Sequence, residues 1–264
     1  MNARRSLLTQ ARYALVTATR SPRVIAFGIA FPIVLLVLFN SIFTSGSNRT
    51  TQFAGGTITT KAYFTAGLTA YAIMLQTFTQ LVVSVTTTQR ESGQLKRLRG
   101  TPMPAWTFIA AYVLRSIVLV ILMVIALFGI GVVAFGVSLR AEAIPGIVVY
   151  AALGTAAFTT LGIAATVLTS SVDAATSVGP FAAVILSFIS GVFLPISQLP
   201  SWLASVGKVF PLYHLADGLQ RTVVSGSSGS GLVGDDLLVL ALWGAGGLLF
   251  AARRFRWEPQ AVAA

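Results

Sequence analysis

The sequence has no cysteine, one histidine and few charged residues. Without cysteine there can be neither a disulfide framework nor a thiolate metal site. A single histidine, with no cysteine or carboxylate pair to join it, also lacks the ligand set of a metal site. Only 9% of the 264 residues are charged, whereas soluble domains carry about 25%. This scarcity argues against a water-soluble enzyme.

Hydrophobic residues are abundant instead. They make up 55% of the chain, and the mean hydropathy is +0.84. The net charge of +11 would suggest nucleic-acid binding in a soluble protein, but so little polar surface favours cationic loops that flank apolar spans. The composition therefore predicts a membrane protein that binds no nucleic acid.

Six apolar stretches are long enough, or nearly so, to cross a bilayer as helices. Such a helix needs about 20 mostly apolar residues. The predicted spans cover residues 24–43, 62–88, 106–137, 144–168, 174–196 and 232–252. We therefore expect an all-α membrane protein in which residues 1–264 form one transmembrane domain. The first apolar run has full spanning length and no A-x-A-like site follows it, so we expect an uncleaved first span.

Basic residues indicate the orientation of these spans. Twelve of the 18 lysines and arginines fall on the side of the two termini, and five fall on the other side. Short cytoplasmic loops are enriched in lysine and arginine. We therefore predict a multi-pass protein of the cell (plasma) membrane with both termini in the cytoplasm.

Residues 1–23 form a basic amphipathic pattern. Leucines and alanines recur at helical spacing from Leu7 to Ala18, while Arg4, Arg5 and Arg12 point elsewhere. Such a helix beside a membrane usually lies in the interface. It is either a simple surface anchor or a platform that contacts a cytoplasmic partner.

The predicted cytoplasmic loop of residues 89–104 has an ordered sequence. A short helix can run from Glu91 to Arg99, with Gly100 as its C-terminal cap and Pro102 to stop it. Its acidic residue is near the positive end of the helix dipole and its basic residues are near the negative end. Leu98 and a second leucine one turn earlier form an apolar knob. This pattern favours a protein-docking element over a plain solvated loop.

Prolines and apolar residues characterise residues 197–231, which lie between the last two predicted spans. The same pattern begins at the end of the preceding span. Pro195, Pro200 and Pro211 break regular helix, while Trp202 belongs to an apolar set at near-helical spacing. The piece is too short to span and too apolar for a free loop, so we predict a re-entrant or interfacial segment that packs against protein. His214 favours a structural hydrogen bond within it. Farther along, Asp217 and Arg221 are four residues apart and could pair on one helical turn, and an exposed pair would contribute little.

A polar stripe follows the second predicted span. It keeps roughly to the helical period and consists of Thr65, Thr69, Gln76, Gln80, Ser84 and Thr87. Such side chains either hydrogen-bond neighbouring helices or line a translocation path, and both are possible in a dimer whose path lies at the subunit interface. No carboxylate lies within a span core, which argues against ion-coupled transport.

The chain has no phosphate-binding loop of the G-x-x-x-x-G-K-[ST] type and no catalytic constellation. Any ATP chemistry must therefore come from another chain.

Two segments resemble the ABC-2 type ABC transporter permeases. The run ESGQLKRLRGTPMPAW, from Glu91 to Trp106, is similar to the coupling-helix region of that family. The run GVFLPISQLPSWL from Gly191, followed by FPLYHL from Phe210, resembles the segment between the family's fifth and sixth spans. Chain length, number of spans and cytoplasmic termini agree as well.

The resemblance implies a half-transporter that pairs with a second permease, as a homodimer or a heterodimer. Each permease would bind one of two ATPase subunits, so that ATP and Mg are held by the partner and no cofactor by this chain. The residues that would couple to the ATPase are Glu91, Gly93, Leu98, Thr101 and Pro102, with charge supplied by Lys96, Arg97 and Arg99. The external gate would be shaped by Pro195, Pro200, Trp202, Pro211 and His214.

We therefore expect an ATP-driven exporter of an amphipathic small molecule, similar to drug and antibiotic efflux permeases. An exporter of a lipid or glycan is the nearest alternative. A secondary, ion-coupled transporter, an integral-membrane enzyme and a scaffold protein are rivals from other classes, and the sequence contains no mid-membrane charges or acid–base pairs to favour the first two.

Overall fold

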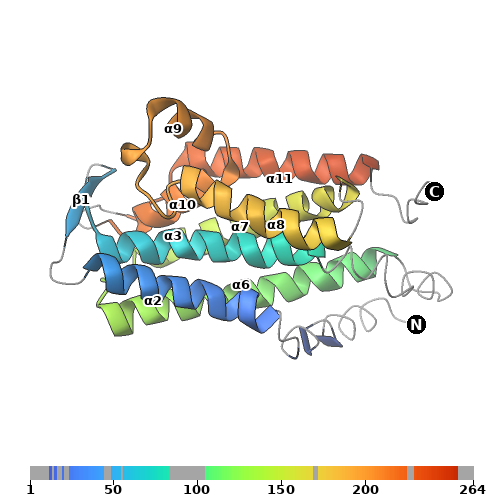
Figure 1. The fold of residues 1–264 in the computed structure, drawn as a ribbon, viewed down its shortest axis with the longest axis horizontal. Helices are drawn as coiled ribbons and strands as arrows, with labels where there is room; N and C mark the ends of the chain where they lie inside the picture. Colours follow the sequence, from blue (N-terminus) through green and yellow to red (C-terminus); the bar gives the residue numbers. More distant parts are fainter. Residues whose placement is uncertain are drawn as a thin grey trace.

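The computed structural model describes residues 12–13, 15–16, 20, 24–44, 49–54, 56–83, 105–168, 172–224 and 229–254. These residues form a bundle of helices with a small hairpin at one end (Figure 1). We call this end the hairpin end and the opposite one, where the last helix finishes, the Arg254 end.

Apolar helices make up the body of the bundle. The π-helix η1 (Val24–Ala30) continues into α2 (Phe31–Thr44), and α3 (Thr60–Met74) continues into the π-helix η2 (Leu75–Thr79). The longest helices are α6 (Ala105–Phe135), α7 (Ala143–Leu168) and α11 (Gly234–Arg254), and α8 (Val172–Ile189) is shorter. Consecutive members of this set run in opposite directions along the bundle (Figure 1).

Four of the described helices are long and apolar enough to cross a membrane. They cover Thr60–Val83, Val113–Phe135, Ala143–Val167 and Gly234–Arg253, at the positions of the second, third, fourth and sixth predicted spans. The first and fifth predicted spans contain the shorter apolar helices Gly28–Phe43 and Gly179–Ile189. The described part of the chain is therefore mostly helical and contains four helices of spanning length, which agrees with a helical membrane protein.

The fifth predicted span is wrong at its C-terminal end. We expected it to reach residue 196, but α8 ends at Ile189. Gly191 has a φ of +75°, the left-handed conformation that commonly ends helices, and the Val192 amide closes the motif by donating to the Ser187 carbonyl oxygen at 3.2 Å. The apolar run of Val192 to Leu194 continues the hydropathy signal beyond the helix end.

A β-hairpin was not predicted. Strands β1 (Thr50–Phe53) and β2 (Gly56–Thr59) pair antiparallel, with Thr50 opposite Thr59. Their threonines and isoleucine have high β-propensity. The hairpin leads directly into α3, since β2 ends at Thr59 and α3 begins at the next residue. The Thr59 hydroxyl caps this helix by accepting a hydrogen bond from the Ala62 amide at 3.3 Å.

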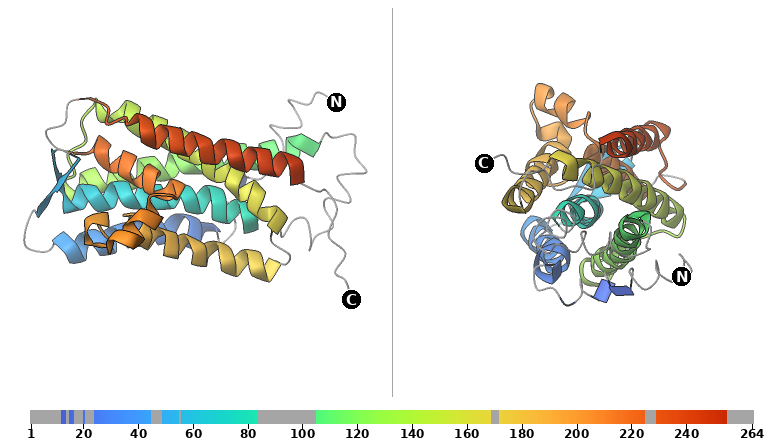
Figure 2. Two further views of the ribbon diagram at one scale, coloured as in Figure 1. Left: turned by 90° about the horizontal axis from the view of Figure 1, so that it is seen from above. Right: turned by 90° about the vertical axis from the view of Figure 1, so that its right-hand side faces the viewer.

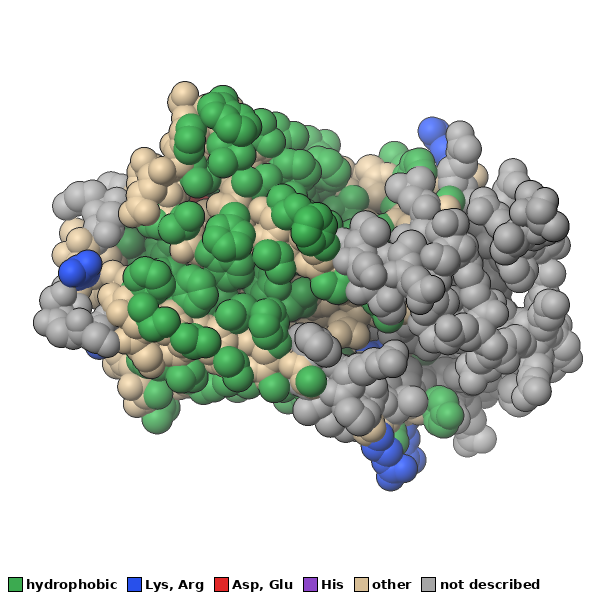
Figure 3. All heavy atoms as spheres, viewed as in Figure 1, with side chains coloured by type: hydrophobic (Ala, Val, Ile, Leu, Met, Phe, Trp, Pro, Cys, Tyr) green, Lys and Arg blue, Asp and Glu red, His purple; other side chains and the backbone are tan. Residues whose placement is uncertain are grey.

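Helix α3 is the core of the bundle. Every residue from Ala62 to Met74 is buried, and the end-on view of Figure 2 shows α3 surrounded by the other helices. In contrast, α2, α6, α8 and α11 expose large apolar side chains such as Val37, Ile125, Phe181 and Leu249. Hydrophobic side chains accordingly cover much of the described part of the face in Figure 3. This extent of exposed apolar surface suits lipid or another membrane chain rather than water.

Candidate functional site

Three short helices lie between α8 and α11 at the hairpin end. They are η3 (Ile196–Gln198), α9 (Ser201–Gly207) and α10 (Pro211–Thr222). Pro195 and Pro200 directly precede η3 and α9, and Pro211 is the first residue of α10. Proline has a fixed φ and lacks an N–H, so it favours helix starts. The predicted helix breaks are therefore present, and each proline marks the start of a new helix.

Helix α9 and helix α10 have opposite environments. Trp202 on α9 is 67% exposed, and α9 stands out from the bundle in Figure 1. In α10, Leu212, Leu215 and Leu219 are fully buried, and the helix packs against α3, α7 and α11. At about 1.5 Å per residue, its 12 residues are too short to span a bilayer. Helix α10 thus has the packing against protein that the re-entrant prediction requires, while its depth in a membrane stays a prediction.

Close approach to α7 determines the position of α10. A Cβ atom at Gly218 would overlap the ring of Tyr150, which is itself fully buried. On the other side, a Cβ at Gly154 of α7 would lie 2.7 Å from a methyl group of Leu215. The two helices therefore contact each other through glycine on both sides, which leaves α10 little room to shift.

His214 connects α10 to α11. Its Nδ1 lies 2.7 Å from Asp236 Oδ1, and its Nε2 lies 2.8 Å from the carbonyl oxygen of Lys208. The predicted structural hydrogen bond is therefore present. The Asp236 carboxyl group orients the His214 ring through this contact. The sequence did not predict the contact, because the two residues are 22 positions apart along the chain.

Both partners of the His214 ring are acceptors, so only the doubly protonated ring donates to both. Burial lowers the pKa of His214, but the hydrogen bonds to Asp236 and to the Lys208 carbonyl, together with the electrostatic effect of Asp236 and Asp217, raise the pKa above its usual value of 6.5. The geometry and the direction of the shift agree in favouring the doubly protonated form of His214.

The Asp217–Arg221 pair lies in the same region, and its predicted i,i+4 contact is present. The pair is not the exposed one that would contribute little, because Asp217 is only 7% exposed. The Arg221 Nε donates to its carboxylate, and the Arg221 guanidinium lies 5.9 Å from the ring centroid of Phe53 on β1. The pair therefore attaches α10 to the hairpin as well as spanning one helical turn.

One carbonyl group joins three elements. The Gly191 oxygen, just beyond the end of α8, accepts hydrogen bonds from the Tyr63 hydroxyl of α3 and from Gln220 Nε2 of α10, the latter at 3.1 Å. We call Tyr63, Gly191 and Gln220 the three-helix junction. Nothing in the sequence predicted it, because its members come from three distant segments.

The polar stripe lies inside the protomer. Thr65 and Thr69 are fully buried and donate to carbonyl oxygens of their own helix, both at 2.7 Å. Gln76 is buried and donates from Nε2 to the Gly28 carbonyl of η1 at 2.8 Å, and Gln80 is half-buried. These contacts are those of helix packing. A role as a translocation path stays a prediction, and Ser84 and Thr87 lie outside the described residues.

A comparison with protein-family models decides the family. The ABC-2 type transporter model matches residues 6–224, most of the chain. The chain belongs to the ABC-2 type transporter family. It is thus a membrane permease subunit of an ABC transporter, a transport subunit that is not itself catalytic. A search of curated proteins found no match.

The coupling residues predicted for this ABC-2 permease, from Glu91 to Pro102, lie outside the described residues. So does most of the N-terminal segment 1–23. The elements on either side of the coupling segment are described: the helix that continues from η2 finishes, and α6 begins, at the Arg254 end (Figure 1). In the described part of the permease, no group of three or more metal-binding side chains occurs.

Proposed function

We propose that this permease is the membrane half of an ATP-driven exporter that moves an amphipathic small molecule outward. A separate ATPase subunit hydrolyses ATP with Mg and docks on residues 89–104. Two permeases, identical or not, and two ATPase subunits make up the transporter in the cell membrane. The observation that carries the proposal is the family match, which includes the whole predicted coupling segment.

The positions of buried charge support an external source of energy. Among the described residues, the buried aspartate, glutamate, histidine, lysine or arginine side chains are Arg115, Asp217 and Asp236. Arg115 is three residues into a candidate span, and Asp236 is the third residue of α11. None of them is at the middle of a described span, where proton- or ion-coupled transporters usually carry a carboxylate. In the proposed transporter, ATP hydrolysis by a partner subunit supplies the energy that an ion-coupled transporter takes from an ion gradient.

The arrangement of the two ends supports a division of labour. The hairpin end contains α9, the packed α10 and the three-helix junction, which suit an external gate. The Arg254 end carries both borders of the coupling segment (Figure 1). In the proposed cycle, ATP-driven closure of the two ATPases pushes on the coupling segments, and the spans transmit this movement to the gate.

The test is transport by inside-out vesicles that contain the permease and its ATPase. We expect ATP-dependent accumulation of an amphipathic dye that survives ionophores. Accumulation that ionophores abolish would instead indicate a secondary transporter. ATP-dependent uptake of a lipid or glycan, with none of the dye, would support the alternative cargo class.

Two variants test the coupling assignment. Glu91→Arg reverses a charge of the predicted docking helix, and Leu98→Asp places a charge on its apolar knob. Both should abolish transport and co-purification with the ATPase while leaving membrane insertion intact. Gln94→Ala, in the same segment but with no assigned role, is the matched control. If both variants retain the ATPase, the coupling assignment is wrong.

A further inference from the structure

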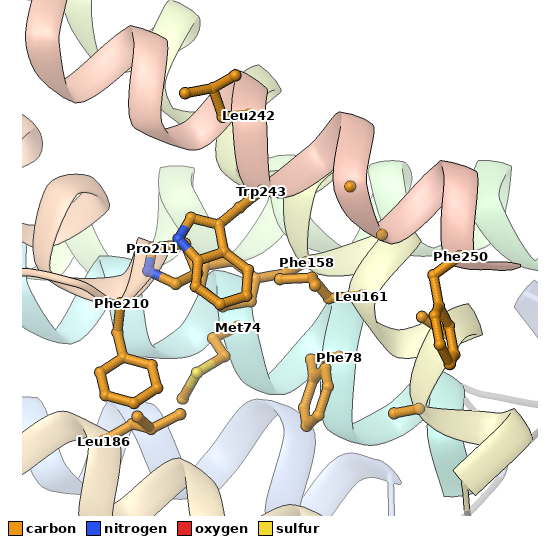
Figure 4. A pocket seen from close by; sticks show the side chains of 14 residues that line it. Met74, Phe78, Phe158, Leu161, Leu186, Phe210, Pro211, Leu242, Trp243 and Phe250 are labelled. Carbon is orange, nitrogen blue, oxygen red and sulfur yellow. The ribbon is translucent and has the colours of Figure 1, made fainter.

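A cavity of about 580 Å³ opens between α8 and α11. Its floor is formed by Met74 and Phe78 of the α3–η2 helix and by Phe158 of α7, and Trp243 and Phe250 border it along α11 (Figure 4). The start of α10 closes it towards the hairpin end. This volume falls within the range of about 300–1,000 Å³ that is usual for small-molecule sites.

Among the described residues that line the cavity, no side chain is free to bind a polar ligand. Its lining consists of aliphatic, aromatic, methionine, proline and glycine residues. The single N–H donor among these side chains, Trp243 Nε1, already donates to the Val209 carbonyl oxygen at 2.9 Å. An occupant is therefore held by packing alone, which suits a hydrocarbon chain.

Two adjacent glycines of α11 explain why a hollow exists here. A Cβ at Gly247 would lie 3.0 Å from Thr160 Oγ1 and from the Leu161 amide nitrogen of α7, so this glycine allows α11 to pack closely. Gly246 lines the cavity, and a Cβ there would meet no atom within 4 Å. The close contact and the open space thus lie side by side on one helix.

The cavity faces the surroundings of the bundle rather than its interior. Leu242 and Phe250 line it and are also 61% and 40% exposed. Between them lie the middle and later turns of α11, a candidate membrane span, where a bilayer presents hydrocarbon and no water. Helices α8 and α11 also carry exposed apolar side chains outside the cavity lining, among them Phe181 and Leu249.

We propose that this cavity is a binding site for one acyl chain of a bilayer phospholipid. The chain enters between α8 and α11, and the headgroup stays outside. Its contacts include Phe210 and Pro211, so the bound chain supports the start of α10. The proposal goes beyond the transport function and does not require the ATPase, so either can fail without the other.

The test is photo-crosslinking of the full-length permease in phosphatidylcholine nanodiscs that contain a phospholipid with a diazirine on one acyl chain. Mapping of the label by peptide mass spectrometry should find it preferentially on the α11 peptide that carries Trp243 and Phe250. Gly246→Leu places an apolar side chain in the cavity, and its Cβ would meet no atom within 4 Å. Labelling there should fall about tenfold, which corresponds to about 1.4 kcal/mol of binding free energy. Gly129→Leu is the matched control, because a Cβ at this exposed glycine of α6 also meets no atom within 4 Å.

A second cavity-filling variant keeps the proposal testable if Gly246→Leu does not fold. Ala165→Phe fills the cavity from α7, where Ala165 lines it, and should reduce the label in the same way. The proposal would be overturned if Gly246→Leu and Ala165→Phe were both labelled as strongly as the unsubstituted permease. It would also be overturned if the amount of label on each peptide depended only on how exposed that peptide is. Displacement of the label by a transported amphipathic dye would overturn it as well, because the occupant would then be cargo.

Discussion

The His214–Asp236 pair should make the permease more stable at acidic than at alkaline pH. The pKa of His214 is raised in the folded protein. A raised pKa means that the folded state holds the proton more tightly, so the contribution is complete below the unfolded pKa of about 6.5. It is lost as the pH rises through the folded pKa. His214→Leu removes the pair and both ring hydrogen bonds, and with them this pH dependence.

The burial of the pair determines the expected size of the effect. The side chains of His214 and Asp236 are 12% and 6% exposed. Loss of one partner of a buried pair costs about 3–5 kcal/mol, whereas an exposed pair contributes about 0–1 kcal/mol. Because the edge of the ring reaches the surface, we expect an intermediate loss of about 2 kcal/mol for His214→Leu near pH 6. In a chain of this size, that corresponds to a fall in melting temperature of roughly 4–8 °C.

The assay is thermal unfolding of the detergent-solubilised permease at about pH 6 and about pH 9. The unsubstituted protein should melt at a higher temperature at the lower pH, and His214→Leu should narrow the difference. Asp236→Asn removes the same charge pair from the other side and should have a similar effect. Asp235→Asn is the control, because this neighbouring carboxylate is exposed. An unchanged pH dependence in both His214→Leu and Asp236→Asn would refute the reasoning.

Two further predictions concern packing and the polar stripe. Gly218→Ala should lower the melting temperature by roughly 2–12 °C, because forcing a methyl group into a packed core costs about 1–3 kcal/mol and the ring of Tyr150, which this methyl group would meet, is fully buried. Gly129→Ala, in open space, should have little effect. Equal melting temperatures of the two variants would contradict the packing. Gln76→Leu combined with Gln80→Leu should change the relative transport rates of different cargoes more than co-purification with the ATPase. If every cargo tested is transported as before, the two glutamines serve only packing.

Hydropathy predicted where the apolar helices lie, but less reliably where they end. The helix that begins as α3, and helices α6, α7 and α11, occupy four of the six predicted spans, because runs of about 20 apolar residues are a strong local signal. The end of α8 depends instead on the backbone conformation of Gly191. The hairpin was missed because its threonine-rich strands carry no long apolar run. Short strands of this composition are hard to distinguish from a polar loop.

The tertiary contacts of the candidate site could not be obtained from local patterns. His214 and Asp236, like Tyr63 and Gly191, meet only because α10 folds back among α3, α7 and α11. The burial of Asp217 has the same origin, and the i,i+4 spacing alone predicted its partner but not its surroundings. The prolines were informative, because their effect on the backbone is local and independent of neighbours.

The three-helix junction restricts how the hairpin end can open. Tyr63 and Gln220 share the single acceptor at Gly191, so moving the end of α8 away from α3 and α10 breaks both bonds in the same step. Packed elements of this kind tend to have discrete arrangements rather than a continuum. Widening at this end would consequently be abrupt, with a shut and an open position and no stable halfway stage.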